Sequence, residues 1–334
     1  MILAERSVSL PAEMKDLKSQ RLRAMKRRSR YFLKSIINHV YQRAVNGFLV
    51  FYNVSDYLVF FTMMCIIAPK YGVQVLMCSL MPDHFHLSSC AERRNNLSNC
   101  VKEITRLFAH EQNLICHREG QLFSHPFGSV PKPGDKKGRA NLIYVGNNGP
   151  ERRLALRAED YRWSFLAYAK SDHPFSEPIV IRRASPDLKR AIKEVESTHN
   201  DGKHLKYRQL QRLFKPLVRK EKEQLTDFII SLYNIIDYDN AAILFDSFDD
   251  MLNAMHSNTG SEYDINEVFI GKSDAHYAKM MSLVLKKYNF KDIHDVLRLS
   301  LEEKNDVFQF LMANTDALPE QIAAFLRIPV KSFN

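Results

Sequence analysis

The chain has 334 residues, more than one ordinary compact domain needs and enough for two. Hydrophobic residues make up 45% and charged residues 26%, which excludes an intrinsically disordered chain and is typical of a globular protein. The 48 Lys and Arg residues exceed the 38 Asp and Glu residues, giving a formal net charge of +10 and a sequence pI near 9.3. This charge favours polyanionic partners, nucleic acid above all, although a solvated basic surface explains it equally well.

The five cysteines are odd in number and include no C-x-x-C pair. This pattern argues against a disulfide framework and a thiolate zinc site, and it fits a reducing cytoplasm. The first twenty residues lack a signal-peptide pattern, and the most apolar stretch, residues 47–69, is interrupted by Asn53 and Asp56. We therefore expect a cytoplasmic protein without a membrane segment.

The chain opens with a basic arm at residues 1–34. Residues 36–43 then have the pattern of a strand, and residues 55–68 have the pattern of a helix. Ser55 is the expected N-cap of this helix and Pro69 its expected stop.

Residues 73–80 form an apolar strand pattern, the break at residues 81–83 predicts a turn, and residues 84–90 return as a paired strand. Apolar side chains at helical spacing over residues 97–108 predict a helix, and residues 122–130 are the next extended run. The resulting order is β-α-β-β-α-β, the ferredoxin-like arrangement of the α+β class. It predicts an antiparallel sheet with both helices on one face and with the first and third strands in the centre.

Two helices, expected at residues 138–148 and 161–170, complete a first domain over residues 35–170. The polar, proline-containing residues 171–180 have the composition of a linker. Beyond them the pattern is helical almost throughout, which predicts an all-α domain over residues 181–334.

Ser185 is the expected cap of the first helix in this second half, with Pro186 in its first turn. Further helices are expected over residues 217–236 and 273–288. Residues 301–334 contain two short helical patterns that look like a truncated helix-turn-helix, with accidental packing of small helices as the alternative.

The segment His84-Phe85-His86 places two imidazoles on one face of a strand, because side chains two residues apart in a strand project to the same side. Phe85 and Leu87 project to the other face and are expected to pack. Two histidines in this arrangement can hold a divalent metal ion, whereas an isolated His-x-His is more often a pair of polar strand residues. The motifs around the pair favour the metal.

The segment Met81-Pro82-Asp83-His84-Phe85-His86-Leu87 resembles the HUH signature of the single-tyrosine insertion-sequence transposases, and especially of the REP-associated tyrosine transposases. Tyr144 followed by Asn148, and then Glu159-Asp160-Tyr161-Arg162-Trp163-Ser164, is similar to the tyrosine helix and the closing stretch of that family. The resemblance covers about residues 35–170. Its three motifs follow in the family's order on a strand pattern that independently predicts the family's fold.

The resemblance implies a metal-dependent enzyme that cleaves and rejoins single-stranded or hairpin DNA through a 5′-phosphotyrosine intermediate. Tyr144 is the implied nucleophile, since a phenol forms a phosphoester once its proton is lost. His84 and His86 are the implied ligands of Mg²⁺ or Mn²⁺, which polarises the phosphate and stabilises the departing oxygen. The relatives pair through this domain, so the implied assembly is a homodimer.

Asn148 lies four residues after Tyr144, on the same face of a helix, so its amide oxygen is a candidate third metal ligand. The sequence Asn147-Asn148-Gly149-Pro150 is also an ordinary helix stop. The family usually has proline directly after this asparagine, whereas Gly149 intervenes here. Gly146 should weaken the helix further, by about 1 kcal/mol. The register of this helix therefore stays open.

Tyr161 and Tyr168 are alternative nucleophiles, but Trp163 and Phe165 beside them indicate an aromatic stretch that packs on the sheet. His39, on the first strand, is either a hydrogen-bond partner of a metal ligand or an ordinary polar strand residue.

Basic residues concentrate over residues 182–222, with Tyr207 and Phe214 between them, a pattern that suits a DNA backbone but also a solvated helix face. The candidate DNA contacts are Arg27, Arg28, Arg43, Lys206 and Arg212.

Two further functions stay open. One is a DNA-binding regulatory protein that keeps the fold without cleaving, and the other is an unrelated phosphoesterase that uses the histidines without a covalent tyrosine.

Overall fold

The computed structural model describes residues 31–124, 126–257, 271 and 273–329. Residues 1–30 of the predicted basic arm, which include Arg27 and Arg28, lie outside this description, as do the residues after 329 in the predicted helix-turn-helix. The remainder, from Phe32 onward, forms one compact unit.

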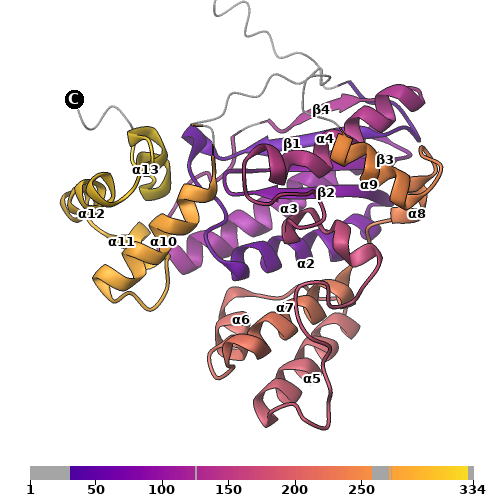
Figure 1. The fold of residues 1–334 in the computed structure, drawn as a ribbon. Coiled ribbons are helices and arrows are strands. Elements are labelled where there is room, and N and C mark those ends of the chain that lie inside the picture. The colour runs from indigo at the N-terminus through magenta and orange to yellow at the C-terminus, as the bar shows by residue number, and fades with distance from the viewer. Residues whose placement is uncertain (1–30, 125, 258–270, 272, 330–334) are drawn as a thin grey trace, which may run out of the picture. The chain divides into compact units, whose positions relative to one another are not determined.

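Four strands form one antiparallel sheet in the order β2-β3-β1-β4 (Figure 1). The fold is of the α+β class, as predicted, and β1 and β3 occupy the centre of the sheet. β4 is shorter than the extended run expected there, because the described residues just before it, 122–124 and 126–127, pair with the sheet only through an isolated bridge between Ala44 and Phe123. The strands are β1 (Asn38–Arg43), β2 (Val73–Met81), β3 (His84–Ala91) and β4 (Gly128–Pro131).

Helices α2 (Val54–Lys70) and α3 (Arg94–Cys116) pack on one face of this sheet. Phe85 of β3 points to that face, where its ring centroid lies 4.9 Å from that of Phe60 in α2. Helix α4 (Asp135–Glu151) lies across the opposite face, where Ser88 of β3 donates a hydrogen bond to Asn141. The sheet is therefore covered on both sides, and the alternation of side chains along β3 decides which residues meet α4.

The predicted start of α2 is wrong by two residues. Asn53, rather than Ser55, is the N-cap: its side chain accepts from the Asp56 amide, and the Asp56 carboxylate accepts from the Asn53 amide. This reciprocal capping box satisfies two helix-end donors at once, which a cap at Ser55 does not achieve. Pro69 lies within the last turn instead of stopping the helix before it.

The short helix expected at residues 161–170 is two 3₁₀ turns, η2 (Arg162–Ser164) and η3 (Leu166–Ala169). Phe165 between them adopts a left-handed conformation with φ of 62°, which interrupts an α-helix. Another 3₁₀ turn, η1 (Val45–Gly47), follows β1.

The described elements after residue 180 are all helices, as predicted, and Ser185 caps the first of them. The predicted linker at 171–180 does not separate two cores, because α2 is apolar nearly all round and buries its outer side against the helices that follow. The helices are α5 (Pro186–Asn200), α6 (Tyr207–Phe214), α7 (Arg219–Tyr233), α8 (Tyr238–Ala242), α9 (Phe248–Ser257), α10 (Ala275–Tyr288), α11 (Asp295–Arg298), α12 (Leu301–Asn314) and α13 (Pro319–Leu326).

Within the described part of the chain, no helix is both long and apolar enough to cross a membrane.

Candidate functional site

The two histidines of the motif lie on the face of β3 that α4 covers. His84 and His86 are fully buried, as are Phe85 and Leu87 on the opposite face. The predicted division of the two faces is confirmed, and α4 closes the histidine face off from solvent.

Helix α4 runs antiparallel to β3, and its inward side chains meet the strand in sequence. Asn141 accepts a hydrogen bond from Ser88 at 2.8 Å, and the ring centroid of Tyr144 lies 5.5 Å from that of His86. The fold thus brings Tyr144 against His86, and Asn148 lies about one helical turn further along α4.

Asn148 is oriented by its own helix. Its side-chain nitrogen donates to the Tyr144 carbonyl at 3.0 Å, which directs the other end of the amide away from the helix backbone. The buried Oδ1 atom has no hydrogen-bond partner among the residues that the structure describes. A buried carbonyl oxygen in this state is costly and is a suitable ligand for Mg²⁺ or Mn²⁺.

Among the described residues, no group of three or more His, Cys, Asp or Glu side chains is placed to hold a metal ion. A site built on His84 and His86 therefore needs oxygen ligands of another kind. The Asn148 amide oxygen fits that need, and the phosphate oxygens of a DNA substrate are a second source.

Asp83 belongs to the histidine motif and contacts His84, although no role was predicted for it from the sequence. Its carboxylate lies 2.5 Å from His84 Nδ1, so Nε2 is the ring nitrogen that does not face this carboxylate. Burial raises the pKa of Asp83, but His84, Arg43 and Arg152 outweigh that effect and hold this pKa below its ordinary value of 3.8. In the sequence, only the position of Asp83 directly before the first histidine could have indicated this contact.

Gly146 and Gly149, which made the helix register doubtful, are positions of close approach. A Cβ on Gly146 would stand 2.6 Å from the sulfur of Met255 in α9, and one on Gly149 would stand 2.7 Å from Tyr161. The predicted end of the helix at Asn148 is therefore wrong: α4 continues to Glu151, with Pro150 in its last turn. The two glycines do not end α4 but leave space for the side chains of Met255 and Tyr161.

Further contacts hold α4 in place. Asn147 donates to the Met255 carbonyl at 2.9 Å, and Arg152, directly after the helix, forms a buried ion pair with Asp274 at 2.6 Å. Tyr144 itself is only 3% exposed. The candidate site is therefore closed in this structure.

Tyr161 and Tyr168 are core residues, as predicted. The Tyr161 hydroxyl donates to the Leu80 carbonyl, and the Tyr168 hydroxyl donates to Asp227, both at 2.7 Å. Burial raises the pKa of Tyr161 well above its ordinary value, which disfavours the phenolate that a nucleophile needs.

The candidate DNA contacts differ in their surroundings. Arg43 lies opposite His84 in the β1–β3 register, beside the site. Lys206 is exposed directly before α6, whereas Arg212 is held by Glu194 through two hydrogen bonds, at 2.7 and 2.5 Å. Arg212 is therefore less suited to bind phosphate than the sequence indicated.

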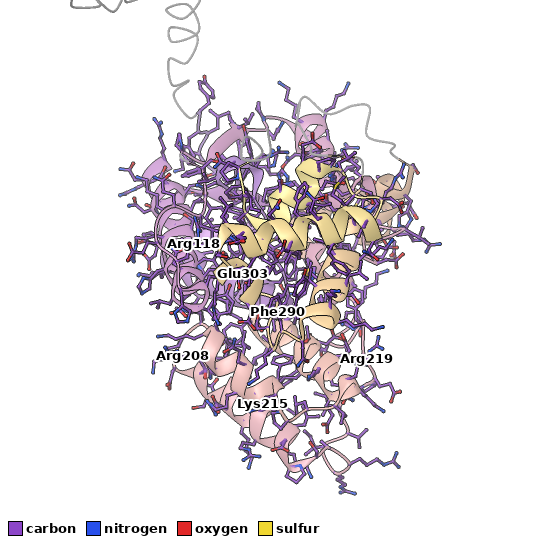
Figure 2. The ribbon with its side chains drawn as sticks, turned by 90° about the vertical axis from the view of Figure 1, so that its left-hand side faces the viewer. Arg118, Arg208, Lys215, Arg219, Phe290 and Glu303 are labelled. Atoms are coloured by element: carbon purple, nitrogen blue, oxygen red, sulfur yellow. The ribbon has the colours of Figure 1, made fainter. Side chains whose placement is uncertain are left out.

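Two other basic residues near Arg212 are better placed to bind phosphate: Arg208 in α6 and Lys215 directly after α6. Arg208 and Lys215 are exposed, and they line a basic groove of about 660 Å³ together with Gln211, Arg212 and Pro216. Figure 2 shows both side chains on the helical half of the molecule.

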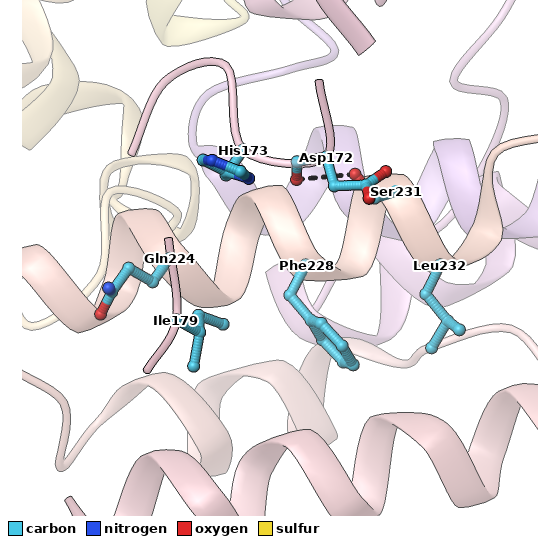
Figure 3. A pocket seen from close by; sticks show the side chains of 7 residues that line it. All are labelled: Asp172, His173, Ile179, Gln224, Phe228, Ser231 and Leu232. Carbon is cyan, nitrogen blue, oxygen red and sulfur yellow. Dashed lines mark hydrogen bonds between the residues drawn. The ribbon is translucent and has the colours of Figure 1, made fainter. Parts of the chain in front are cut away.

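Another pocket, of about 330 Å³, lies beside α7 (Figure 3). Phe228, Leu232 and Ile179 supply its apolar wall, and Ser231 donates to the Asp172 carbonyl at its edge. Neither pocket is lined by His84, His86, Tyr144 or Asn148.

No protein-family model matches this chain, and no curated protein matches it. A search of solved structures finds a REP-associated tyrosine transposase bound to a REP hairpin, which is 16% identical with a TM-score of 0.37. The match covers 42% of this chain and 81% of that protein.

Proposed function

We propose that this protein is a metal-dependent enzyme that nicks and rejoins single-stranded or hairpin DNA, with Tyr144 as its nucleophile on a ferredoxin-like domain. The observation that carries the proposal is the meeting of Tyr144 with His86 across the α4–β3 contact. These residues lie 58 positions apart in the sequence, in two motifs that resemble those of the HUH transposases. Their proximity supports one site instead of two unrelated motifs.

In the proposed reaction the deprotonated oxygen of Tyr144 attacks a phosphodiester phosphorus. Tyr144 has first given its phenolic proton to solvent. A bond then forms between the tyrosine oxygen and phosphorus, the bond to the 3′ oxygen breaks, and the departing oxygen takes up a proton from solvent. The products are a 5′-phosphotyrosine and a free 3′ hydroxyl, and the reverse reaction of that hydroxyl rejoins the strand.

His84, His86 and Asn148 would hold the divalent metal, Mg²⁺ or Mn²⁺. When bound there, the ion polarises the phosphate and stabilises charge on the departing oxygen. Asp83 keeps the His84 ring in the orientation that presents Nε2. Because Tyr144 and both histidines are buried, DNA reaches them only after α4 shifts relative to β3.

The test is incubation of the protein with a labelled pool of single-stranded hairpins that carry randomised flanks, with Mn²⁺ or Mg²⁺, followed by a denaturing gel. We expect a protein–DNA adduct that EDTA prevents. An adduct that forms equally in EDTA contradicts the metal requirement. Hairpin binding without any adduct supports the second candidate, a DNA-binding protein that keeps the fold without cleaving, which the burial of Tyr144 favours.

The basic groove beside α6 is the proposed contact for the DNA backbone. Replacing both Arg208 and Lys215 by alanine should lower the slope of log K against log salt concentration by about one to two, since each lost phosphate contact removes about 0.7 for a single strand. Fluorescence anisotropy at several salt concentrations measures it. Arg212→Ala is the matched control, and its slope should change less because Glu194 holds that guanidinium. An unchanged slope in the double variant makes the groove a solvated surface.

We also propose a homodimer, as the resemblance implies. Multi-angle light scattering should give a mass near twice the 38.9 kDa of one chain. A mass of one chain, with and without hairpin DNA and well above the concentrations used for activity, rules the dimer out.

A further inference from the structure

His39 is a buried polar residue on β1, the central strand next to β3. In the β1–β3 register it pairs with Ser88, so its side chain lies on the α4 side of the sheet, diagonal to His86. His39 Nε2 lies 2.9 Å from His86 Nδ1, and the two rings stack with centroids 5.1 Å apart at 25°. A hydrogen bond thus joins the two imidazoles.

Tyr41, not His39, is directly opposite His86, yet it leaves this position open. Its ring is turned towards β4, where it lies over Gly128: a Cβ there would stand 2.2 Å from the Tyr41 Cζ atom. The Tyr41 ring centroid is consequently 6.4 Å from that of His86. Glycine at position 128 therefore makes room for Tyr41, and His39 takes the place beside His86.

A hydrogen bond between two neutral imidazoles has two possible directions, and they differ in their consequence for the site. If His86 donates from Nδ1, its Nε2 carries a lone pair and can bind a metal ion, while His39 keeps its proton on Nδ1. If His39 donates from Nε2, the proton of His86 sits on Nε2 and blocks metal binding. The partner of Nδ1 therefore decides whether His86 is a ligand.

We propose that His39 is the positioning residue of His86: it accepts the Nδ1 proton of His86 and so makes Nε2 the metal-binding nitrogen. This inference rests on the proposed metal role of His86. The Asp83 carboxylate holds Nδ1 of His84 in the same way, so both imidazoles of the motif are held at the same ring atom. A neutral acceptor suits the deeper position, because a second carboxylate there would be a buried charge without compensation.

The first experiment compares Mn²⁺ binding by wild type, His39→Phe and His39→Gln, with free Mn²⁺ followed by electron paramagnetic resonance. Phenylalanine keeps an aromatic ring in the buried space but accepts no hydrogen bond, whereas the glutamine side chain offers a carbonyl oxygen. We expect His39→Phe to weaken Mn²⁺ binding about 10- to 100-fold, the usual effect of losing a partner of a metal ligand, and His39→Gln to weaken it less. Tyr41→Phe is the matched control and should bind like wild type.

The second experiment needs no metal. In protein labelled with ¹⁵N at histidine, NMR should show the His86 proton on Nδ1, and His39→Phe should redistribute it between the two nitrogens. A His86 proton on Nε2 in the wild type overturns the inference, as does equal Mn²⁺ affinity of wild type and His39→Phe. If the wild type binds no Mn²⁺, the proposed metal site fails, and the proton position still decides for or against the His39 contact alone.

Discussion

Tyr144→Phe abolishes covalent attachment to DNA and lowers the cleavage rate by about 10⁴-fold or more, the scale on which a lost nucleophile acts. The substitution removes only the phenolic oxygen. The ring keeps its packing against His39 and His86, with centroids 5.7 and 5.5 Å away, so hairpin binding is expected to stay unchanged. Adduct gels and cleavage time courses measure the two activities, and anisotropy measures binding.

Two controls separate the nucleophile from other causes. Tyr161→Phe also removes a buried phenol oxygen, the donor to the Leu80 carbonyl, and should still form the adduct despite a stability cost of about 1–3 kcal/mol. The double variant His84→Ala with His86→Ala keeps Tyr144 but removes two proposed metal ligands, so it should lose metal-dependent cleavage. Cleavage by Tyr144→Phe at the wild-type rate would falsify the assignment and point to water or another tyrosine.

Asp56→Ala lowers the free energy of unfolding by about 3–5 kcal/mol, because it removes one partner of a fully buried ion pair. The Asp56 carboxylate lies 3.0 Å from His294 Nε2 and accepts from the Tyr207 hydroxyl at 2.5 Å. It also accepts from the Tyr52 amide at 2.7 Å and closes the capping box of α2 with Asn53. One side chain thus ties α2 to α6 and to the segment before α11, and its loss leaves His294 facing Asp292 alone.

Urea denaturation measures this effect, and Asp295→Ala is its matched control. Asp295 forms a partly exposed ion pair with Arg298, three residues on in the chain, for which the expected loss is about 1 kcal/mol or less. An equal loss of unfolding free energy in both variants contradicts the prediction that the buried pair contributes more to stability than the exposed one.

The buried pair also predicts how stability depends on pH. Burial raises the pKa of Asp56, but His294 and Tyr207 outweigh it and hold this pKa below 3.8, so its contribution is present above that pH and lost as the pH falls through the folded value. Burial lowers the pKa of His294, but Asp56 and Asp292 hold it well above 6.5, so its contribution is present below 6.5 and lost as the pH rises through the raised value. Asp56→Ala should therefore flatten the stability profile on the acid side.

The sequence by itself determined the local elements and the sidedness of the motif. Alternation along β3 set His84 and His86 on one face, and the cap and proline at Ser185 and Pro186 set the start of α5. These features depend on backbone geometry within a few residues. The strand period of two and the helix period of 3.6 determine which neighbouring side chains share a face, so the order of residues is enough to predict them.

Only the tertiary structure decided which distant segments touch these elements. Gly146 and Gly149 have the local signature of a helix end, but α9 and Tyr161 pack against them, and burial of those neighbours outweighs helix propensity. His39 reaches His86 because two strands pair in one register out of several, and Asp56 meets His294 across 238 residues. Such contacts depend on how faces pack after the elements form, and a single sequence carries no local pattern for that packing.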